Sequence, residues 1–362
     1  MSAKRHHYLP TFLIRRFAQR KDPPFVYRLD VSSGRTRLVP PRSQAFRHQY
    51  YRFDLEGEPI ELDGEPVDPG IVEKDLQRID GDAANAIRRL VSGVEIEPRE
   101  RFALAIFCAV QERRTPQGRA EARFMDEFLH TLEQEMWFSN KGDFLAHART
   151  AVPEISEEEI ENFRVDTLEQ IQSGKLVFKA PRARELALIF FQLDEVVLKV
   201  LKECEWWIMR VDEDAPDLVL SDVGITQVDH TPRHPKAGRG WMSSPGAETI
   251  LPIDPRMAVV VTPGSGDWFW GDIDADEVED INLRSYAHSD VCYYGTSQES
   301  VCELRRLARR ESVQIGEYAP RSPVLWVAET EGPSSGEMDF TGYSVRGTTK
   351  ARFIVDPDAT KE

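Results

Sequence analysis

The hydrophobic pattern of this chain changes period at residues 206–211, and this change constrains the fold more than any other feature. From residue 71 to residue 205, apolar side chains recur three or four positions apart, as on amphipathic helices. From Trp206 onward, short runs of β-branched and aromatic residues follow, and such runs are typical of strands. A helical middle followed by strand-rich segments predicts an α+β protein.

Helices are predicted over five segments of the middle: residues 71–92, 98–115, 117–149, 156–174 and a segment that begins at Pro181. We expect Ile71, Phe102 and Met136 on the apolar faces of the first three. Ser156 begins a capping box at the fourth. The fifth helix carries apolar residues on nearly all of its sides, so we expect it to be the central, most buried helix.

The C-terminal portion mixes strands and helices. Strands are predicted at residues 206–211, 218–220, 249–251, 257–261, 291–294 and 351–355, and helices at residues 276–289 and 297–309. We therefore divide the chain into a basic N-terminal module (1–53), a helical region (71–205) and a mixed region (206–362) packed on it. Residues 54–70 are rich in Gly, Pro and acids and predict a surface loop.

The basic module has its own predicted elements. Pro10 suits the first turn of a helix on which Leu13 and Phe17 share one apolar face. Residues 25–31 and 35–39 alternate around a Ser-Ser-Gly turn and predict a β-hairpin. So many apolar side chains are unusual in a free tail, and we expect the module to pack on the body.

Charge is distributed unevenly along the chain. Residues 1–53 contain twelve Lys and Arg but two acids, a formal charge of +10, and because the whole chain carries −16, the remainder carries −26. An acidic body disfavours non-specific binding to nucleic acid or anionic membranes, whereas a basic segment can bind phosphates locally. The basic side chains either contact nucleic acid or pair with the acidic body. The arginines considered for a nucleic-acid surface are Arg5, Arg15, Arg16, Arg47, Arg113 and Arg114.

The composition predicts a cytoplasmic protein without a membrane segment. No run approaches the roughly 18 to 20 apolar residues of a membrane helix. We expect no signal peptide, because no apolar segment with a small-residue cleavage site follows the basic start. The four cysteines are scattered without the spacing of a zinc site, and free thiols fit a reducing compartment.

His6 and His7 are the first candidates for a chemical role. Adjacent residues on a regular element point in different directions, so the two side chains are not expected to chelate one metal together. One would face a site as ligand, general base or phosphate donor while the other packs or orients it, and His48 could complete such a site. The alternative is that His6-His7-Tyr8 ties the N-terminus to the body through hydrogen bonds.

Asp222 is the second candidate, because it ends a predicted strand. A carboxylate there can hold a divalent metal or accept a proton, although Ser and Asp also begin turns. Arg113 and Arg114 end a predicted helix, where arginines either clamp an anion or interact with the helix dipole.

Several segments carry a resemblance to a known family. They are the opening His6-His7-Tyr8-Leu9-Pro10, the helix end Arg114-Thr115-Pro116, the pair Ser221-Asp222, and Asn282. On these residues the chain resembles the bacterial family named domain of unknown function 4238, whose members open with His-His-Tyr-Val/Leu-Pro. The family has Asn-Pro after its Ser-Asp pair, where this chain has Val223-Gly224. The resemblance implies no activity.

Two hypotheses of function follow from these observations. The first is a nucleic-acid-processing enzyme, a metal-assisted nuclease of bacterial defence or toxin type. His6, His7 and Asp222 would form its site, with Mg²⁺ or Mn²⁺ bound by His7 and Asp222. The second is a non-enzymatic protein with structural histidines that binds nucleic acid, a protein partner or a second copy of itself.

Overall fold

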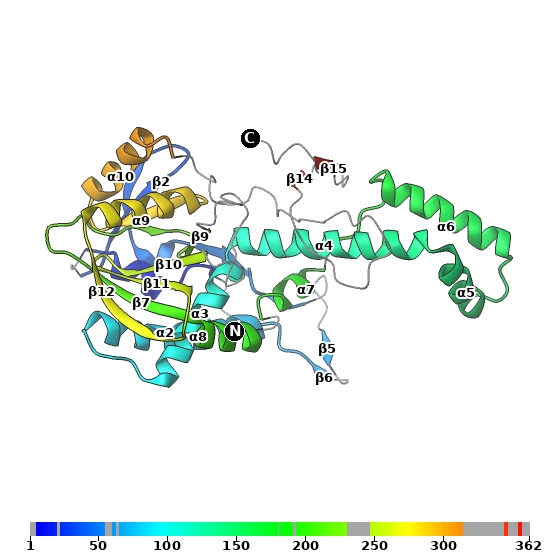
Figure 1. Ribbon diagram of the computed structural model, residues 1–362, viewed down its shortest axis with the longest axis horizontal. Coiled ribbons are helices and arrows are strands. Elements are labelled where there is room, and N and C mark those ends of the chain that lie inside the picture. Colours follow the sequence, from blue (N-terminus) through cyan, green and yellow to red (C-terminus); the bar gives the residue numbers. More distant parts are fainter. Residues whose placement is uncertain are drawn as a thin grey trace. The chain divides into compact units, whose positions relative to one another are not determined.

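The computed structural model describes residues 5–19, 22–54, 60–62, 65–179, 181–190, 193–229, 247–313, 344–346 and 354–356. The chain forms two compact units. The first contains residues 1–119 and 182–321, and the second contains residues 120–181 and 322–362. The chain combines helices with several separate sheets, which confirms the predicted α+β class, and Figure 1 labels many of these helices and strands.

A five-stranded sheet with the order β12-β7-β11-β10-β9 lies in the first unit. Its strands are β7 (Cys204–Val211), β9 (Thr226–Asp229), β10 (Ala247–Asp254), β11 (Met257–Pro263) and β12 (Trp268–Ile273). β7 runs antiparallel to β11 and parallel to β12. The predicted strands that correspond to β7, β10 and β11 are confirmed, whereas the sequence pattern predicts neither β9 nor β12.

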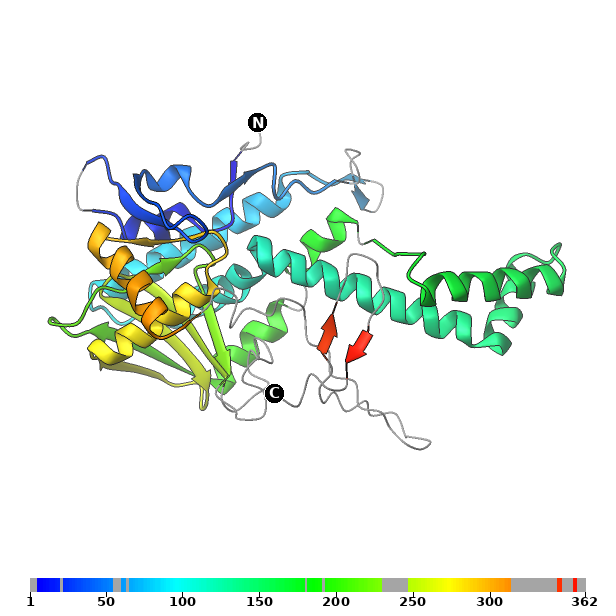
Figure 2. The ribbon, with the colours of Figure 1, turned by 90° about the horizontal axis from the view of Figure 1, so that it is seen from above.

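A four-stranded sheet in the first unit pairs strands from near the start of the chain with strands from residues 220–295. It has the order β3-β2-β13-β8, with β2 (Val26–Asp30), β3 (Thr36–Val39), β8 (Leu220–Ser221) and β13 (Cys292–Gly295). Leu29 and Tyr293 face each other across β2 and β13 and pack with α10 (Gln298–Arg310), which Figure 2 shows beside β2. Arg28 and Tyr294 pair on the opposite face of this sheet, because side chains alternate along strands.

Helices cover both sides of the five-stranded sheet, as Figure 1 shows, with α9 (Ala275–His288) on one side and α2 (Ile71–Val91), α3 (Pro98–Arg114) and α8 (Leu193–Glu203) on the other. The long helix predicted from Pro181 is instead two helices, α7 (Arg182–Ala187) and α8. Leu198 of α8 is 49% exposed, so the expectation that this is the most buried helix is wrong. That place belongs to α3, where Leu104, Phe107 and Cys108 have no exposed surface.

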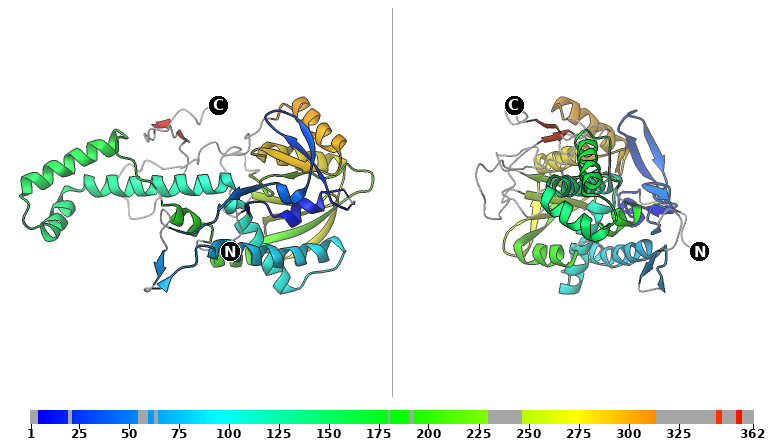
Figure 3. Two further views of the ribbon diagram at one scale, coloured as in Figure 1. Left: turned by 180° about the vertical axis from the view of Figure 1, so that it is seen from behind. Right: turned by 90° about the vertical axis from the view of Figure 1, so that its right-hand side faces the viewer.

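The N-terminal elements belong to the first unit, in agreement with the expectation that the basic module packs on the body. They are β1 (Arg5–His7), α1 (Thr11–Arg16), the short 3₁₀ helix η1 (Pro41–Ser43) and β4 (Phe46–His48). Leu13, Ile14 and Phe17 are completely buried in the main core. Burial of each such side chain stabilises the fold by about 1.5–3 kcal/mol. Figure 3 shows α1 against the five-stranded sheet, where Arg16 pairs with Asp254 of β10.

The second unit is mainly helical, with most of α4 (Pro116–Ser139), α5 (Lys141–Ala151) and α6 (Glu157–Gln172), and includes the strand pair β14 (Ser344–Arg346) and β15 (Ile354–Asp356). The single helix predicted over residues 117–149 is interrupted at Asn140, whose side chain accepts the N–H of Asp143 and caps α5. The capping box at Ser156 is confirmed. The strand predicted at residues 351–355 overlaps β15, and its remainder lies outside the described residues.

Some local predictions are wrong. Ile71, Phe102 and Met136 are 41%, 38% and 65% exposed instead of buried. Phe102 and the buried Phe107 are five positions apart, which places them about 140° apart around α3. Two short strands, β5 (Glu61–Leu62) and β6 (Glu65–Pro66), pair within the predicted loop. None of the described helices is long and apolar enough to cross a membrane.

Candidate nucleic-acid interface

β1 and β4 form a two-stranded antiparallel ribbon that carries both histidines of the opening. In its register His6 lies opposite Arg47, and His7 lies opposite Phe46. Successive side chains of a strand point to opposite faces, so the adjacent histidines separate as the sequence predicts. His6 is buried with 1% of its surface exposed, whereas His7 is half-buried.

His6 is held in the first unit by main-chain and ring contacts. Its Nδ1 accepts the backbone N–H of Tyr51 at 2.8 Å, and its ring stacks on that of Tyr51 with centroids 5.7 Å apart. Glu73 Oε2 lies 3.8 Å from the same nitrogen. A nitrogen that accepts an N–H carries no proton, so the Glu73 contact is not an ion pair with a protonated Nδ1. His6 therefore acts as an acceptor for the buried main chain.

The contacts continue from Tyr51 to an ion pair between the buried Arg114 and the partly exposed Asp80. The Tyr51 hydroxyl donates to the backbone oxygen of Arg114 at 3.0 Å, and the Arg114 guanidinium lies 2.8 Å from Asp80. Burial raises the pKa of Asp80, while the charge of Arg114 lowers it. Burial also raises the pKa of Glu73 to about 6. Arg114 has no exposed surface, so it does not belong to a surface that contacts phosphate.

His7 contacts the segment that leads into β4. Its Nδ1 lies 3.0 Å from the backbone oxygen of Gln44, and with a proton on Nδ1 the ring donates to that carbonyl. Burial lowers the pKa of His7, and the positive charges of Arg5 and Arg114 lower it further, against the effect of the Gln44 carbonyl. The ring is therefore neutral at pH 7.

Asp222 ties β8 to the segment before β13. Its two carboxylate oxygens accept the backbone N–H groups of Asp290 and Val291, each at 2.9 Å, and its own N–H donates to the oxygen of Cys292 at 3.0 Å. Asp222 is 1% exposed, and burial raises its pKa to about 7 although the two N–H groups favour the charged form. Through these contacts Asp222 holds the end of β8 against the backbone of residues 290–292.

Three further titratable groups lie near Asp222. Burial raises the pKa of Tyr8, and the charge of Asp222 raises it further. The same two causes raise the pKa of Cys292 to about 12 and that of Tyr294 well above its ordinary value. All three groups are therefore neutral at pH 7, and none is an activated nucleophile in that state.

The residues predicted to bind a metal do not gather as a ligand set in the described part of the chain. There, no hydrogen bond or ion pair joins Asp222 to His6 or His7. Within the same residues, no three His, Cys, Asp or Glu side chains lie close enough to hold a metal ion. Binding of a metal by His7 and Asp222 stays a prediction, and the described part of the chain supplies no third protein ligand for it.

The basic module contains nine described Lys and Arg side chains, and they fall into two groups. Arg16 and Arg52 pair with Asp254 and Asp54, which lie outside the module as the body-pairing alternative predicts, whereas Arg28 pairs with Asp30 of the module itself. The other six are exposed and have no acidic partner among the described residues. These six form the exposed arginine set: Arg5, Arg15, Arg35, Arg37, Arg42 and Arg47.

Two members of this set lie on aromatic rings. The Arg5 guanidinium is 4.8 Å from the centroid of Phe46, and that of Arg47 is 5.3 Å from Tyr50. Arg113 is half-buried, and burial lowers its pKa, so its guanidinium is less accessible to a ligand than these exposed groups. Arg35, Arg37 and Arg42 are not among the arginines that the sequence analysis considers for a nucleic-acid surface. The positive charge of the module was the one sequence signal that pointed to them.

Comparison with known families agrees with the resemblance of the opening residues. Residues 5–298 match the family described as "Protein of unknown function (DUF4238)". The chain belongs to this family. No curated protein and no solved structure matches it.

The segments that resemble the DUF4238 family meet at one buried side chain, Gln111 of α3. Its Nε2 donates to the backbone oxygens of Tyr8 at 3.1 Å and Val223 at 2.9 Å, and its Oε1 accepts from Arg114 Nε at 2.7 Å. One amide thus joins the His-His-Tyr opening, the helix that ends in Arg-Thr-Pro and the segment after Ser-Asp. In this DUF4238 chain these motif residues build the scaffold.

Two further residues of the resemblance also have structural contacts. Gly224, which follows the Ser-Asp pair where the family has Asn-Pro, has φ of +83°, and a Cβ there would lie 2.6 Å from Leu9 Cδ1. Asn282 accepts the N–H of Val219 at 2.8 Å and donates to the oxygen of Asp217 at 3.0 Å, which holds the segment that leads into β8.

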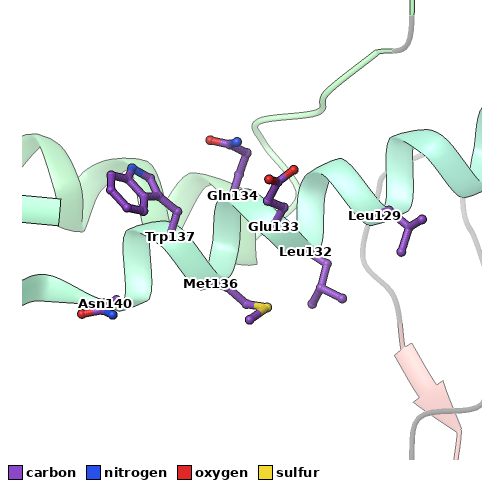
Figure 4. Close-up of a pocket in the computed structure, with 7 residues that line it drawn as sticks. All are labelled: Leu129, Leu132, Glu133, Gln134, Met136, Trp137 and Asn140. Carbon is purple, nitrogen blue, oxygen red and sulfur yellow. The ribbon is translucent and has the colours of Figure 1, made fainter. Parts of the chain in front are cut away.

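A groove of about 540 Å³ lies on α4 in the second unit. Figure 4 shows Leu129, Leu132 and Met136 projecting to the same side of the helix. The lining residues are Leu129, Leu132, Glu133, Gln134, Met136, Trp137 and Asn140. With one carboxylate and no cation, this lining lacks the groups that bind phosphate.

Proposed function

We propose that this protein binds nucleic acid through its phosphate backbone, with the basic module as the contact surface and the His-His-Tyr opening as a structural anchor. The observation that carries the proposal is the exposed arginine set. Its six side chains keep exposed charge without an acidic partner among the described residues, although the chain as a whole has 62 Asp and Glu against 46 Lys and Arg.

Unpaired exposed guanidinium groups favour a phosphate ligand for a physical reason. An arginine that already pairs with a carboxylate, as Arg16 does with Asp254, must give up that contact before it binds an anion. A guanidinium without such a partner gives up only water, and its planar donors match phosphate oxygens two at a time. The acidic remainder of the chain, with formal charge −26, repels the rest of a polyanion and restricts it to the module.

The contacts of the histidines support the non-enzymatic alternative over the nuclease. His6 accepts a main-chain N–H, and both oxygens of Asp222 accept main-chain N–H groups. Groups whose lone pairs are used in this way hold the fold together. Of the three residues predicted to be catalytic, His6 and Asp222 are buried and His7 is half-buried. His7 is therefore the one to mutate in a test of nuclease activity.

One experiment separates binding from cleavage. Fluorescently labelled RNA and DNA strands are titrated with the full chain in EDTA, in Mg²⁺ and in Mn²⁺, and the strands are then examined on denaturing gels. The proposal expects binding in all three conditions and intact strands. If the chain binds neither RNA nor DNA, the proposal is wrong. Cleavage that requires Mg²⁺ or Mn²⁺ and is lost in His7→Ala and Asp222→Ala would support the nuclease instead.

A further inference from the structure

The outer side of the β1–β4 ribbon has an unusual composition. In the register Arg5 lies opposite His48 and His7 opposite Phe46, and directly opposed residues of an antiparallel pair share a face. Alternation places His6 on the inner face, where it is buried. We call the four residues Arg5, His7, Phe46 and His48 the outer ribbon face.

The four side chains of the outer ribbon face form a cluster of planar groups around Phe46, with the rings of His7 and His48 tilted by 59° and 81° to that of Phe46. Phe46 is central: its ring centroid lies 5.7 Å from that of His7, 5.8 Å from that of His48 and 4.8 Å from the Arg5 guanidinium carbon. Arg5 and His48 are exposed, while His7 and Phe46 are half-buried. Solvent therefore reaches a surface built from three rings and one planar cation.

The structure behind this face keeps it in place. His6 binds the Tyr51 N–H from the inner side, the His7 ring contacts the Gln44 carbonyl, and the N–H of Tyr8 donates to the oxygen of Ala45 at 2.9 Å. Groups that are already ordered lose little conformational entropy when a ligand binds. A neutral His7 ring, which its surroundings favour at pH 7, has no hydration shell of a full charge to lose when another ring stacks on it.

We infer that the outer ribbon face binds unpaired bases, so that the nucleic acid held by the module is single-stranded RNA or DNA. The inference rests on the proposed function and adds to it the form of the ligand. Single strands expose the flat faces of their bases, which stack on aromatic rings and on guanidinium planes. A duplex hides those faces in its own stack and offers only base edges and phosphates.

One neighbouring charge fits a strand whose bases lie on this face. Arg5 belongs both to the cluster of planar groups and to the exposed arginine set, whereas Arg47 lies opposite His6 on the other face of the ribbon. A phosphate that flanks a stacked base can therefore contact the Arg5 guanidinium on the same face. With three rings and one guanidinium, the face accommodates about two or three bases, as single-strand-binding sheets do.

The test compares four ligands at one salt concentration: a single-stranded RNA, the matching single-stranded DNA, the duplex of that DNA, and an abasic DNA strand of the same length. The full chain is compared with Phe46→Leu, which keeps an apolar side chain but removes the ring, and with His48→Ala at an exposed position. Phe163→Ala removes an aromatic side chain that is 60% exposed on α6, outside the module, and is the matched control. Urea midpoints verify that every variant folds.

We expect both single strands with bases to bind about tenfold or more tightly than the abasic strand and the duplex. Phe46→Leu and His48→Ala should each lose about tenfold in affinity for the base-bearing strands and keep their affinity for the abasic strand. Phe163→Ala should behave as the wild type. Equal affinity for all four ligands, or tightest binding of the duplex, overturns the inference and leaves phosphate binding intact. The absence of binding to all four overturns the proposed function itself.

Discussion

Replacement of His6 by Phe gives the sharpest test of the structural role of the opening. Phe keeps a ring that can stack on Tyr51, which lies 5.7 Å away, but it has no acceptor for the Tyr51 N–H. Both His6 and Tyr51 are buried, so water cannot replace the lost acceptor. A buried donor left without a partner costs about 1–3 kcal/mol. We therefore expect His6→Phe to lower the free energy of unfolding by about 2 kcal/mol.

His7→Phe is the matched control, because it makes the same chemical change one position away. His7 is half-buried, and water can hydrate the Gln44 carbonyl that it contacts, so the expected loss is below about 1 kcal/mol. Urea unfolding of both variants, followed by tryptophan fluorescence, measures the difference. Equal losses, or no loss in His6→Phe, would refute the assignment of His6 as an anchor.

Two further predictions concern the segment around β8. Burial raises the pKa of Asp222 to about 7, from 3.8, so the stability gained from holding this proton is present at low pH and lost as pH rises from about 4 to about 7. The free energy of unfolding of the wild type relative to Asp222→Asn should therefore fall over that range in urea titrations, and a constant difference would contradict the shift. Gly224→Ala should cost about 2 kcal/mol, because φ is +83° and its Cβ would lie 2.6 Å from Leu9 Cδ1. A urea midpoint within error of the wild type would show that the turn accommodates a side chain.

Local patterns predict much of the fold. Proline and capping residues mark the starts of α3 and α6, where Pro98 and Ser156 stand. Alternation predicts the β2–β3 hairpin and the opposite directions of His6 and His7. These features depend on residues a few positions apart, so the sequence displays them directly.

Features that depend on distant contacts were beyond such patterns. The pairing of β2 with β13, and the three hydrogen bonds of Gln111, join segments that are far apart in the chain. A lone Gln in an apolar helix carries no local signal of its partners. Likewise the acids that pair with Arg16 and Arg114 become visible only in the folded structure, so the sequence could not separate these arginines from Arg15 and Arg47.

The salt dependence of nucleic-acid binding tests the central proposal most directly. Arg15 and Arg16 are adjacent on α1, yet Arg15 is exposed without an acidic partner among the described residues and Arg16 pairs with Asp254. Each phosphate contact contributes about −0.7 to the slope of log K against log salt for a single strand. We expect Arg15→Gln to flatten the wild-type slope by about that amount and Arg16→Gln to leave it unchanged. A wild-type slope near zero, or equal slopes in the two variants, would contradict phosphate binding by the exposed arginine set.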